Sequence, residues 1–254
     1  MLQAQRHERL LEAVNRKGIV TTEELMRTLG ISIATLRRDI NQLSDMGLIE
    51  KVRGGAKALS NRTATEPTLR EKALRNAPQK KKIALEAVTR ITDGETIILD
   101  SGTTTLELAK LLARFTHLTV ITNDLLIALE VSTNTANRLI FIGGTMRANF
   151  CSSYGYHAEN MLKGLSADKL FFSVDAIDAD SGMMSFITDD INLKTIGMRQ
   201  AQASYLLCDH SKFGLRALFA IGMLENLTQI ITDTGLSDAK REAFEKAGIH
   251  LVCV

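Results

Sequence analysis

Apolar residues recur at helical spacing in the first sixty residues, most clearly in the stretch SIATLRRDINQL (32–43). At 100° per residue, four of them fall in one narrow sector, which predicts a helix that is buried on that side: Ile33, Leu36, Ile40 and Leu43. Arg38 lies directly opposite this sector, among small and amide side chains. The exposed side of the predicted helix therefore offers hydrogen-bond donors rather than apolar surface.

A shorter helix is predicted immediately before this one. The residues 21–24, TTEE, have the capping-box pattern that opens a helix, Gly30 can end it in the left-handed conformation, and Ser32 can cap the next helix. Two helices joined by such a short turn form a helix-turn-helix unit, whose second helix enters the DNA major groove. A helix over 6–16 precedes the pair and LIEKVRGGAKAL (48–59) predicts a hairpin, so the whole is a winged helix-turn-helix.

The exposed side of the second helix and the hairpin carry side chains that DNA recognition uses. Arginine can form two hydrogen bonds with guanine, and the side-chain amides of Asn and Gln can do so with adenine. The basic residues of the hairpin are better placed to contact phosphates. We therefore expect contacts to double-stranded DNA from Ser32, Thr35, Arg37, Arg38, Asn41, Gln42, Lys51 and Arg53. Two alternatives stay open at this point, namely an ion pair of Arg37 with Asp39 and a merely flexible exit at Gly54-Gly55.

Beyond Asp93 the pattern changes to short β-branched runs that alternate with helical ones. The candidate strands are 96–100, 118–123, 138–144, 169–178, 203–209, 229–233 and 249–254. Such alternation predicts an α/β domain with a mostly parallel sheet covered on both faces. Residues 58–79 hold both prolines and lack apolar periodicity, so they are predicted to be a linker between a DNA-binding domain over 1–57 and the α/β domain over 80–254.

Small polar residues and glycines follow several of these strands, where open α/β sheets bind ligands. Such residues at a helix start suit a phosphate group, and Lys212 would neutralise it. The candidates, from four loops, are Ser101, Gly102, Thr103, Thr104, Thr105, Asn123, Gly143, Gly144 and Lys212. A Ser/Thr cluster that acts only as a helix cap is the alternative for 101–105.

The formal net charge of +2 divides unevenly along the chain. It is +3 over residues 1–60, +5 over 61–90 and −6 over 91–254, which suggests a polyanionic partner for the front part only. Ordinary surface variation is the alternative. The lysine run 80–82 is expected to be the solvated start of a helix, or else to touch DNA.

Other classes of site receive little support from the sequence. Cys151, Cys208 and Cys253 stand far apart without a CxxC pattern, which favours a reducing compartment over disulfides or zinc, and the histidines are isolated. We expect no metal ion and no cofactor. The charged N-terminus lacks an apolar signal core and no apolar run is long enough to cross a bilayer, so we expect a cytoplasmic protein without a membrane partner.

Taken in order along the chain, these motifs resemble the DeoR family of bacterial transcriptional repressors. The resemblance rests on SIATLRRDINQL, KVRGGA, ILDSGTTT, VITN, GGTMR, VDAID and DHSKFG, and it extends from end to end. It implies a winged-helix domain joined to a sensor domain similar to the ribose-phosphate isomerase and coenzyme A transferase fold. It also implies a repressor of a carbohydrate-catabolism operon that a phosphorylated sugar releases, with the closest similarity to the N-acetylgalactosamine branch.

The resemblance also carries roles over to matching positions. The DNA-reading helix of the family matches Thr35, Arg37 and Arg38. Its effector-binding positions match Asp100, Ser101, Gly102, Thr103, Thr104 and Asp175, and its SSKFG segment matches 211–214. Two departures, His210 where the family commonly has Ser and Ala176 where it has Gly, imply a different ligand shape at that edge.

An enzyme is the competing interpretation. Asp175 and Asp178 resemble the paired aspartates of sugar-phosphate isomerases, and proton abstraction needs a positioned carboxylate base. Those isomerases use a glutamate further along, and here none occurs between Asp178 and Glu225. We therefore expect ligand binding without catalysis. A DNA-binding protein that has no ligand is a third possibility, favoured if the sensor loops are filled by their own side chains.

The number of subunits also bears on DNA binding. A single winged helix makes few phosphate contacts, so we expect a homodimer or homotetramer on repeated half-sites. Apolar residues in HAENMLKGL (157–165) are candidates for the interface, and equally for the core.

Overall fold

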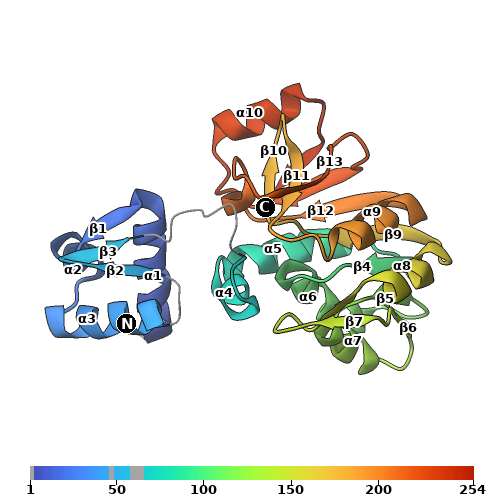
Figure 1. Cartoon of the computed structure of the whole chain (residues 1–254), viewed down its shortest axis with the longest axis horizontal. Coiled ribbons are helices and arrows are strands. Elements are labelled where there is room, and N and C mark those ends of the chain that lie inside the picture. The colour runs from blue at the N-terminus through green and yellow to red at the C-terminus, as the bar shows by residue number, and fades with distance from the viewer. Residues whose placement is uncertain (1–2, 46–48, 58–65) are drawn as a thin grey trace. The chain divides into compact units, whose positions relative to one another are not determined.

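The computed structural model describes residues 3–45, 49–57 and 66–254, and it divides into two compact units, Met1–Arg62 and Thr63–Val254 (Figure 1). Each unit has a hydrophobic core of its own. None of the described helices is both long and apolar enough to cross a membrane.

The first unit is a winged helix-turn-helix, as predicted. Its three helices are α1 (Gln3–Lys17), α2 (Thr22–Leu29) and α3 (Ile33–Asp45). Its strands form an antiparallel sheet in the order β1-β3-β2, with bounds β1 (Ile19–Thr21), β2 (Glu50–Val52) and β3 (Gly55–Lys57). Leu48 and residues 58–59 of the predicted hairpin lie outside the described residues.

The turn between α2 and α3 is built by the residues that predict it. The Thr21 hydroxyl accepts from the Glu24 N–H at 3.2 Å, and the Glu24 carboxylate accepts from the Thr21 N–H at 3.3 Å, which completes the capping box. Gly30 ends α2 at a φ of 64°, and Ser32 Oγ accepts from the Thr35 N–H at 3.3 Å. The predicted caps are therefore confirmed.

The core of this unit is formed by the apolar sides of its helices, including Leu10, Leu25, Leu36, Ile40 and Leu43. Ile33, which was expected in the same sector, is 37% exposed. It is the first residue of α3, so the apolar sector is buried only from Leu36 onward.

A buried carboxylate joins α1 to α3. Asp39 of α3 is only 1% exposed. Arg6 donates to it through Nε at 2.8 Å and Nη2 at 3.1 Å, and His7 Nε2 lies 3.2 Å from its second oxygen. Its partners therefore lie on α1, and the alternative ion pair with Arg37 is not formed.

Replacing Asp39 by asparagine is expected to destabilise this unit by about 1–3 kcal/mol, because the charged hydrogen bonds of a carboxylate that is only 1% exposed are lost. Burial raises the pKa of Asp39, but the hydrogen bonds from Arg6 and His7 outweigh burial and lower it overall. The stabilisation is therefore present above the ordinary aspartate pKa and is lost as the pH falls through the lowered value. Urea unfolding against pH measures both effects.

The matched control is Asp45→Asn, which removes the same charge from an exposed position at the end of α3. A loss of stability in this control as large as that in Asp39→Asn would show that general charge, rather than the contact with α1, is responsible.

The second unit contains a seven-stranded sheet in the order β15-β14-β12-β9-β4-β5-β6, with every neighbouring pair parallel. The strands are β4 (Thr96–Leu99), β5 (Thr119–Thr122), β6 (Arg138–Phe141), β9 (Ala167–Phe172), β12 (Ala201–Leu207), β14 (Gln229–Thr232) and β15 (Leu251–Cys253). The predicted parallel α/β sheet is confirmed.

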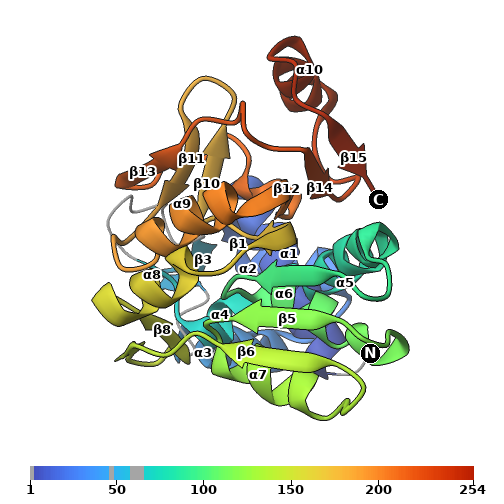
Figure 2. The same ribbon diagram turned by 90° about the vertical axis from the view of Figure 1, so that its right-hand side faces the viewer.

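Helices cover both faces of this sheet (Figure 2). Ile97 and Leu99 of β4 pack in a cluster with α5 (Ala77–Ala87), α6 (Thr103–Ala109) and α7 (Leu125–Ser132). Ile98, between them, packs in another cluster with α8 (Tyr156–Lys163), α9 (Ile191–Gln200) and α10 (Asp238–Lys246). Because side chains alternate along a strand, both faces are apolar, as buried parallel strands require.

Smaller elements surround this sheet. A second, antiparallel sheet has the order β10-β11-β13 and a hairpin joins β7 to β8, with bounds β7 (Thr145–Arg147), β8 (Ser152–Tyr154), β10 (Ala176–Asp178), β11 (Gly182–Ser185) and β13 (Phe219–Gly222). The predicted strand 169–178 is thus two strands in different sheets. Single helical turns are η1 (Val88–Arg90), η2 (Leu112–Arg114) and η3 (His210–Lys212).

The structure differs from the predicted linker over 58–79. Residues 58–65 lie outside the described residues, but helix α4 (Leu69–Leu74) begins soon afterwards and α5 starts at Ala77. Thr68 and Glu71 form a capping box that was not predicted from the sequence. Pro78 lies in the first turn of α5, where a helix needs no N–H donor, so this proline does not indicate a linker.

Candidate functional site

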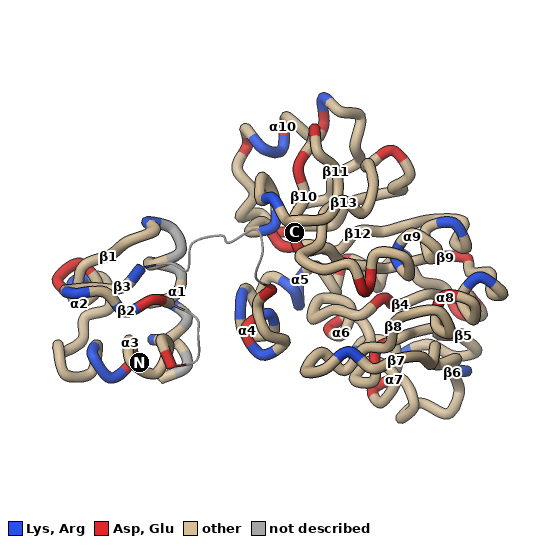
Figure 3. Tube along the Cα trace, viewed as in Figure 1, with Lys and Arg blue, Asp and Glu red and all other residues tan. Residues whose placement is uncertain are grey.

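Helix α3 presents a polar face that remains available for contacts. Arg37, Arg38 and Asn41 are exposed and have no hydrogen-bond or ion-pair partner among the described residues. The two arginines form a continuous stretch of positive charge on α3 (Figure 3). Three of the predicted DNA-contacting side chains are therefore free to reach an external partner.

The other predicted side chains of this helix already have partners. Ser32 and Thr35 contact each other through their hydroxyls at 3.0 Å, and Gln42 accepts from Gln3 Nε2 at 2.6 Å. Contacts of these three with DNA would have to add to, or replace, these bonds.

The hairpin presents Lys51 and Arg53, which are both exposed. Gly54 between the strands has a φ of 85°, and a Cβ on Gly55 would lie 2.2 Å from the carbonyl oxygen of Val20. Both glycines are therefore required by the geometry of the hairpin, which excludes the alternative of a merely flexible exit.

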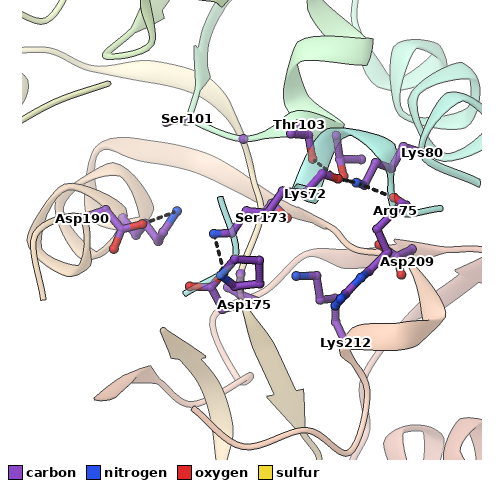
Figure 4. Close-up of a pocket in the computed structure, with 15 residues that line it drawn as sticks. Lys72, Arg75, Lys80, Ser101, Thr103, Ser173, Asp175, Asp190, Asp209 and Lys212 are labelled. Carbon is purple, nitrogen blue, oxygen red and sulfur yellow. Dashed lines mark hydrogen bonds and ion pairs between the residues drawn. The ribbon is translucent and has the colours of Figure 1, made fainter. Parts of the chain in front are cut away.

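In the second unit, the order of the strands marks one position on the sheet. After β4 the chain adds β5 and β6 on one side, and from β9 it adds β12, β14 and β15 on the other. Ligands of open α/β sheets bind at such a switch point, outside the carboxyl ends of the two strands. A pocket lies there, lined by Pro67, Lys72, Arg75, Lys80, Ser101, Gly102, Thr103, Thr104, Ser173, Val174, Asp175, Asp190, Lys194, Asp209 and Lys212 (Figure 4).

The pocket gathers part of the predicted effector site. Six predicted residues line it, from the loops after β4, β9 and β12: Ser101, Gly102, Thr103, Thr104, Asp175 and Lys212. Not all of their groups are free, since the Ser101 hydroxyl donates to Asp124 at 2.7 Å. These segments are far apart in sequence and meet only in the folded sheet.

Four other predicted residues are not among those that line this pocket, so their part in effector binding stays a prediction. Thr105 is fully buried and its hydroxyl donates to Gly102 O at 2.9 Å, while Asn123 Nδ2 donates to Ser153 O at 2.9 Å. Asn123, Gly143 and Gly144 follow β5 and β6, which are one and two strands further from the switch point. The loop after β5 nevertheless contacts the loop after β4, because Asp124, next to Asn123, accepts the hydrogen bond from Ser101.

Gly144 instead has a packing role. A Cβ at this position would lie 2.6 Å from Tyr154 O and 3.0 Å from the Cβ of Ala158, whereas a Cβ on Gly143 would meet nothing within 4 Å. The β7–β8 hairpin and the start of α8 therefore approach the backbone of Gly144 closely.

Gly144→Ala is expected to destabilise the second unit by about 1–3 kcal/mol, because the extra methyl group forces the neighbouring backbone apart. Gly143→Ala is the matched control and should leave the stability nearly unchanged. Thermal unfolding of the two variants measures the difference, and equal stabilities would contradict the packing role.

Asp100, the remaining predicted residue, is not among the residues that line the pocket. It is 5% exposed and forms an ion pair with Lys194 of α9, which also lies 3.4 Å from Asp190. Burial raises the pKa of Asp100 to about 6 in spite of this contact, and the two carboxylates raise the pKa of Lys194. The pair holds α9 against the end of β4.

Sequence reasoning missed several cations of the pocket, namely Lys72, Arg75, Lys80 and Lys194. Lys80 was expected in the solvated start of a helix but is 4% exposed, and it donates to the carbonyl oxygens of Lys72 and Arg75. Burial and the neighbouring cations lower its pKa to about 8, although Asp209 opposes them. Three of these residues lie within 61–90, where the net charge of +5 was the available signal.

The cations of the pocket differ in how they are compensated. Lys72 Nζ lies 2.7 Å from Asp175 and 2.5 Å from Glu66, and Asn76, rather than a cation, bonds Asp209 at 2.6 Å. Arg75 and Lys212 have no hydrogen-bond or ion-pair partner for their side chains within the described part of the chain. Burial lowers the pKa of Lys212 and Lys72 adds to this effect, although the carboxylate of Asp175 opposes it, so a further anion beside Lys212 would favour its charged form.

The two aspartates that suggested an enzyme do not act together. Asp175 is engaged by Lys72, by Ser185 Oγ at 3.2 Å and by the Phe186 N–H at 3.2 Å. Asp178 accepts from the N–H groups of 180 and 181 in a turn. Among the residues that the structure describes, no group of three or more His, Cys, Asp or Glu side chains is placed to hold a metal ion.

Two family profiles match the chain. The profile described as "DeoR-like helix-turn-helix domain" matches residues 6–62, and "DeoR C terminal sensor domain" matches residues 75–234. One profile falls in each unit of the structure.

Individual proteins are similar over nearly the whole chain. The HTH-type transcriptional regulator GolR of Listeria innocua is 32% identical, covering 98% of both chains. The glycerol-3-phosphate regulon repressor of Escherichia coli K12 is 30% identical, covering 92% of both chains. A solved structure of D-ribose-5-phosphate isomerase in complex with phospho-erythronic acid is similar over 54% of each chain, with 17% identity and a TM-score of 0.41.

Proposed function

Because the chain belongs to the DeoR family of transcriptional regulators, we propose that it represses a carbohydrate-catabolism operon and that a phosphorylated sugar releases it from DNA. The relative named as a glycerol-3-phosphate regulon repressor supports a phosphorylated effector. In this proposal residues 1–57 form the DNA-binding part. The whole protein acts in the cytoplasm.

The observation that carries the effector proposal is the pair of pocket cations, Arg75 and Lys212, whose side chains form no hydrogen bond or ion pair with the described residues. Arg75 and Lys212 together supply two positive charges, which match a phosphate monoester with a charge of about −1.5 to −2 at neutral pH. Helix α6 is only seven residues long, so we assign the positive charge to side chains rather than to the helix dipole. Carboxylates and hydroxyls elsewhere in the lining suit the hydroxyl groups of a sugar.

The effector acts by binding one arrangement of the protein more tightly than the other. A coupling of about 1–3 kcal/mol between the two sites would lower operator affinity ~5- to 150-fold, and DNA would weaken effector binding by the same factor. A homodimer or homotetramer with two or more reading helices supplies the phosphate contacts that one winged helix lacks.

Binding without turnover is part of the proposal. Asp175 is held as a carboxylate by Lys72, which lowers its pKa against the effect of burial and makes it a poor proton acceptor. Incubation with the phosphorylated sugar that releases DNA should return that sugar unchanged.

The test is fluorescence anisotropy of the purified protein on the DNA upstream of its own gene. The DNA complex is titrated with hexose, amino-sugar and ketose phosphates, with each free sugar as its control. Tight, salt-sensitive binding that one phosphate abolishes and its free sugar does not is the expected result, and an amino-sugar phosphate would place the protein in the branch that the sequence suggests. DNA binding that no phosphate alters would contradict the effector proposal.

A further inference from the structure

Lys72 links the pocket to the chain segment that continues into residues 58–65. From α4 its ammonium group reaches Asp175 in the pocket and Glu66 at the start of the described segment. Glu66 is bonded in turn by Arg147 of the β7–β8 hairpin, whose guanidinium stacks over Phe150 at 3.8 Å. Lys72 thus connects Asp175, which follows β9, with Glu66, the first described residue after 58–65.

Both partners of Lys72 keep other donors if the lysine moves away. Asp175 retains the Ser185 hydroxyl and the Phe186 N–H, and Glu66 retains Arg147. Departure of the lysine therefore leaves neither carboxylate without a hydrogen bond, which avoids most of the cost of an orphaned buried charge.

Lys194 provides the contrast. Its partner Asp100 is 5% exposed, and among the described residues Lys194 is the only side chain that donates to it, beside a backbone hydrogen bond from Ser173. Movement of Lys194 would leave that carboxylate buried without a cation, so this pair is suited to a fixed structural role.

The helix that carries Lys72 is also weakly held. Helix α4 has six residues, none of which is buried, and its ends depend on the capping box of Thr68 and on Lys80, which donates to two carbonyl groups at its end. An element with so little buried apolar surface opens at low cost.

We propose that Lys72 is an exchangeable anion-binding residue of the pocket, and that its transfer from Glu66 to the bound anion loosens the segment 66–75. The inference rests on the proposed function, since it takes the effector phosphate as the anion. Through the chain itself the loosened segment leads back to residues 58–65 and the DNA-binding unit.

The experiment uses hydrogen–deuterium exchange of the full-length protein, with inorganic phosphate as the probe and chloride at equal ionic strength as the reference. In the wild type, phosphate should slow exchange at 101–104, where it binds, and speed exchange at 68–72, where Lys72 leaves Glu66.

Variants separate the two parts of the inference. Lys72→Met should weaken phosphate binding ~10-fold or more, since a charged hydrogen bond is lost. Glu66→Gln should exchange faster at 68–72 without phosphate and bind phosphate at least ~5-fold more tightly, because the two effects are reciprocal. Arg70→Gln is the charge-matched control on the same helix, at an exposed position, and should behave as the wild type.

Three results would overturn the inference. They differ in whether they also contradict the proposed effector site. Wild-type phosphate affinity in Lys72→Met removes the anion-binding role of this lysine. Normal binding with unchanged or slower exchange at 68–72 removes the loosening step while the pocket stands. Absence of saturable protection at 101–104 in the wild type contradicts the proposed effector site as well.

Discussion

Replacing Arg38 by alanine is expected to lower the affinity for the operator ~5- to 150-fold for each reading helix that engages DNA. The guanidinium projects from the side of α3 opposite the core and has no partner in the described structure, and a bidentate contact of arginine with a base is worth about 1–3 kcal/mol. If two reading helices bind together, the loss is roughly the product of both. Anisotropy on operator DNA measures the change.

The control for this prediction is Arg9→Ala, which removes one positive charge from an exposed position on α1. General electrostatics would weaken both variants alike, whereas loss of a base contact should also relax sequence preference in the Arg38 variant alone. Effector affinity should stay at the wild-type value in both. Unchanged operator affinity in Arg38→Ala would show that α3 does not read DNA in the way proposed.

Lys212→Gln should weaken binding of the phosphorylated effector ~10- to 150-fold, because a charged hydrogen bond of about 1.5–3 kcal/mol is lost. The loss should appear for the phosphate ester and not for any weak binding of the free sugar. Since burial lowers the pKa of Lys212, rising pH removes its charge earlier than in an ordinary lysine. Wild-type effector affinity should therefore fall in alkaline solution, and calorimetric titration at several pH values measures this.

Lys81→Gln is the matched control, since Lys81 is exposed on α5 and lies outside the pocket lining. The control should keep the wild-type effector affinity, and both proteins should bind operator DNA normally in the absence of effector. If Lys212→Gln and Lys81→Gln bind the effector equally well, Lys212 is not the residue that meets the phosphate.

Local patterns predicted the DNA-binding unit well because its chemistry is contained in short segments. The capping box at Thr21, the left-handed Gly30 and the cap at Ser32 act within a few residues, so the sequence contains all the information needed. The contact of Asp39 with Arg6 was not predicted, because it joins residues 33 positions apart whose meeting depends on how α1 packs on α3.

The pocket was predicted only in part for the same physical reason. The sequence indicates which loops follow strands, but it does not give the order of the strands, so loops after β5 and β6 were grouped with those at the switch point. Lys72 and Arg75 were not predicted because they fall in the segment that was predicted to be a linker. Lys194 was not predicted because it projects from the middle of a helix and belongs to no local motif. Strand order and helix placement are long-range properties.

The order of the strands has a consequence for assembly of the protein. Strands β4–β6 and strands β9–β15 are each contiguous in sequence, and the pocket lies at the seam between the two halves. Parallel pairings between such distant segments form late in folding, so the seam closes after much of each half is made. A molecule that binds across the seam stabilises the native state by mass action. All residues that line the pocket precede β13, so a nascent chain cannot form the complete pocket before Lys212 has been synthesised.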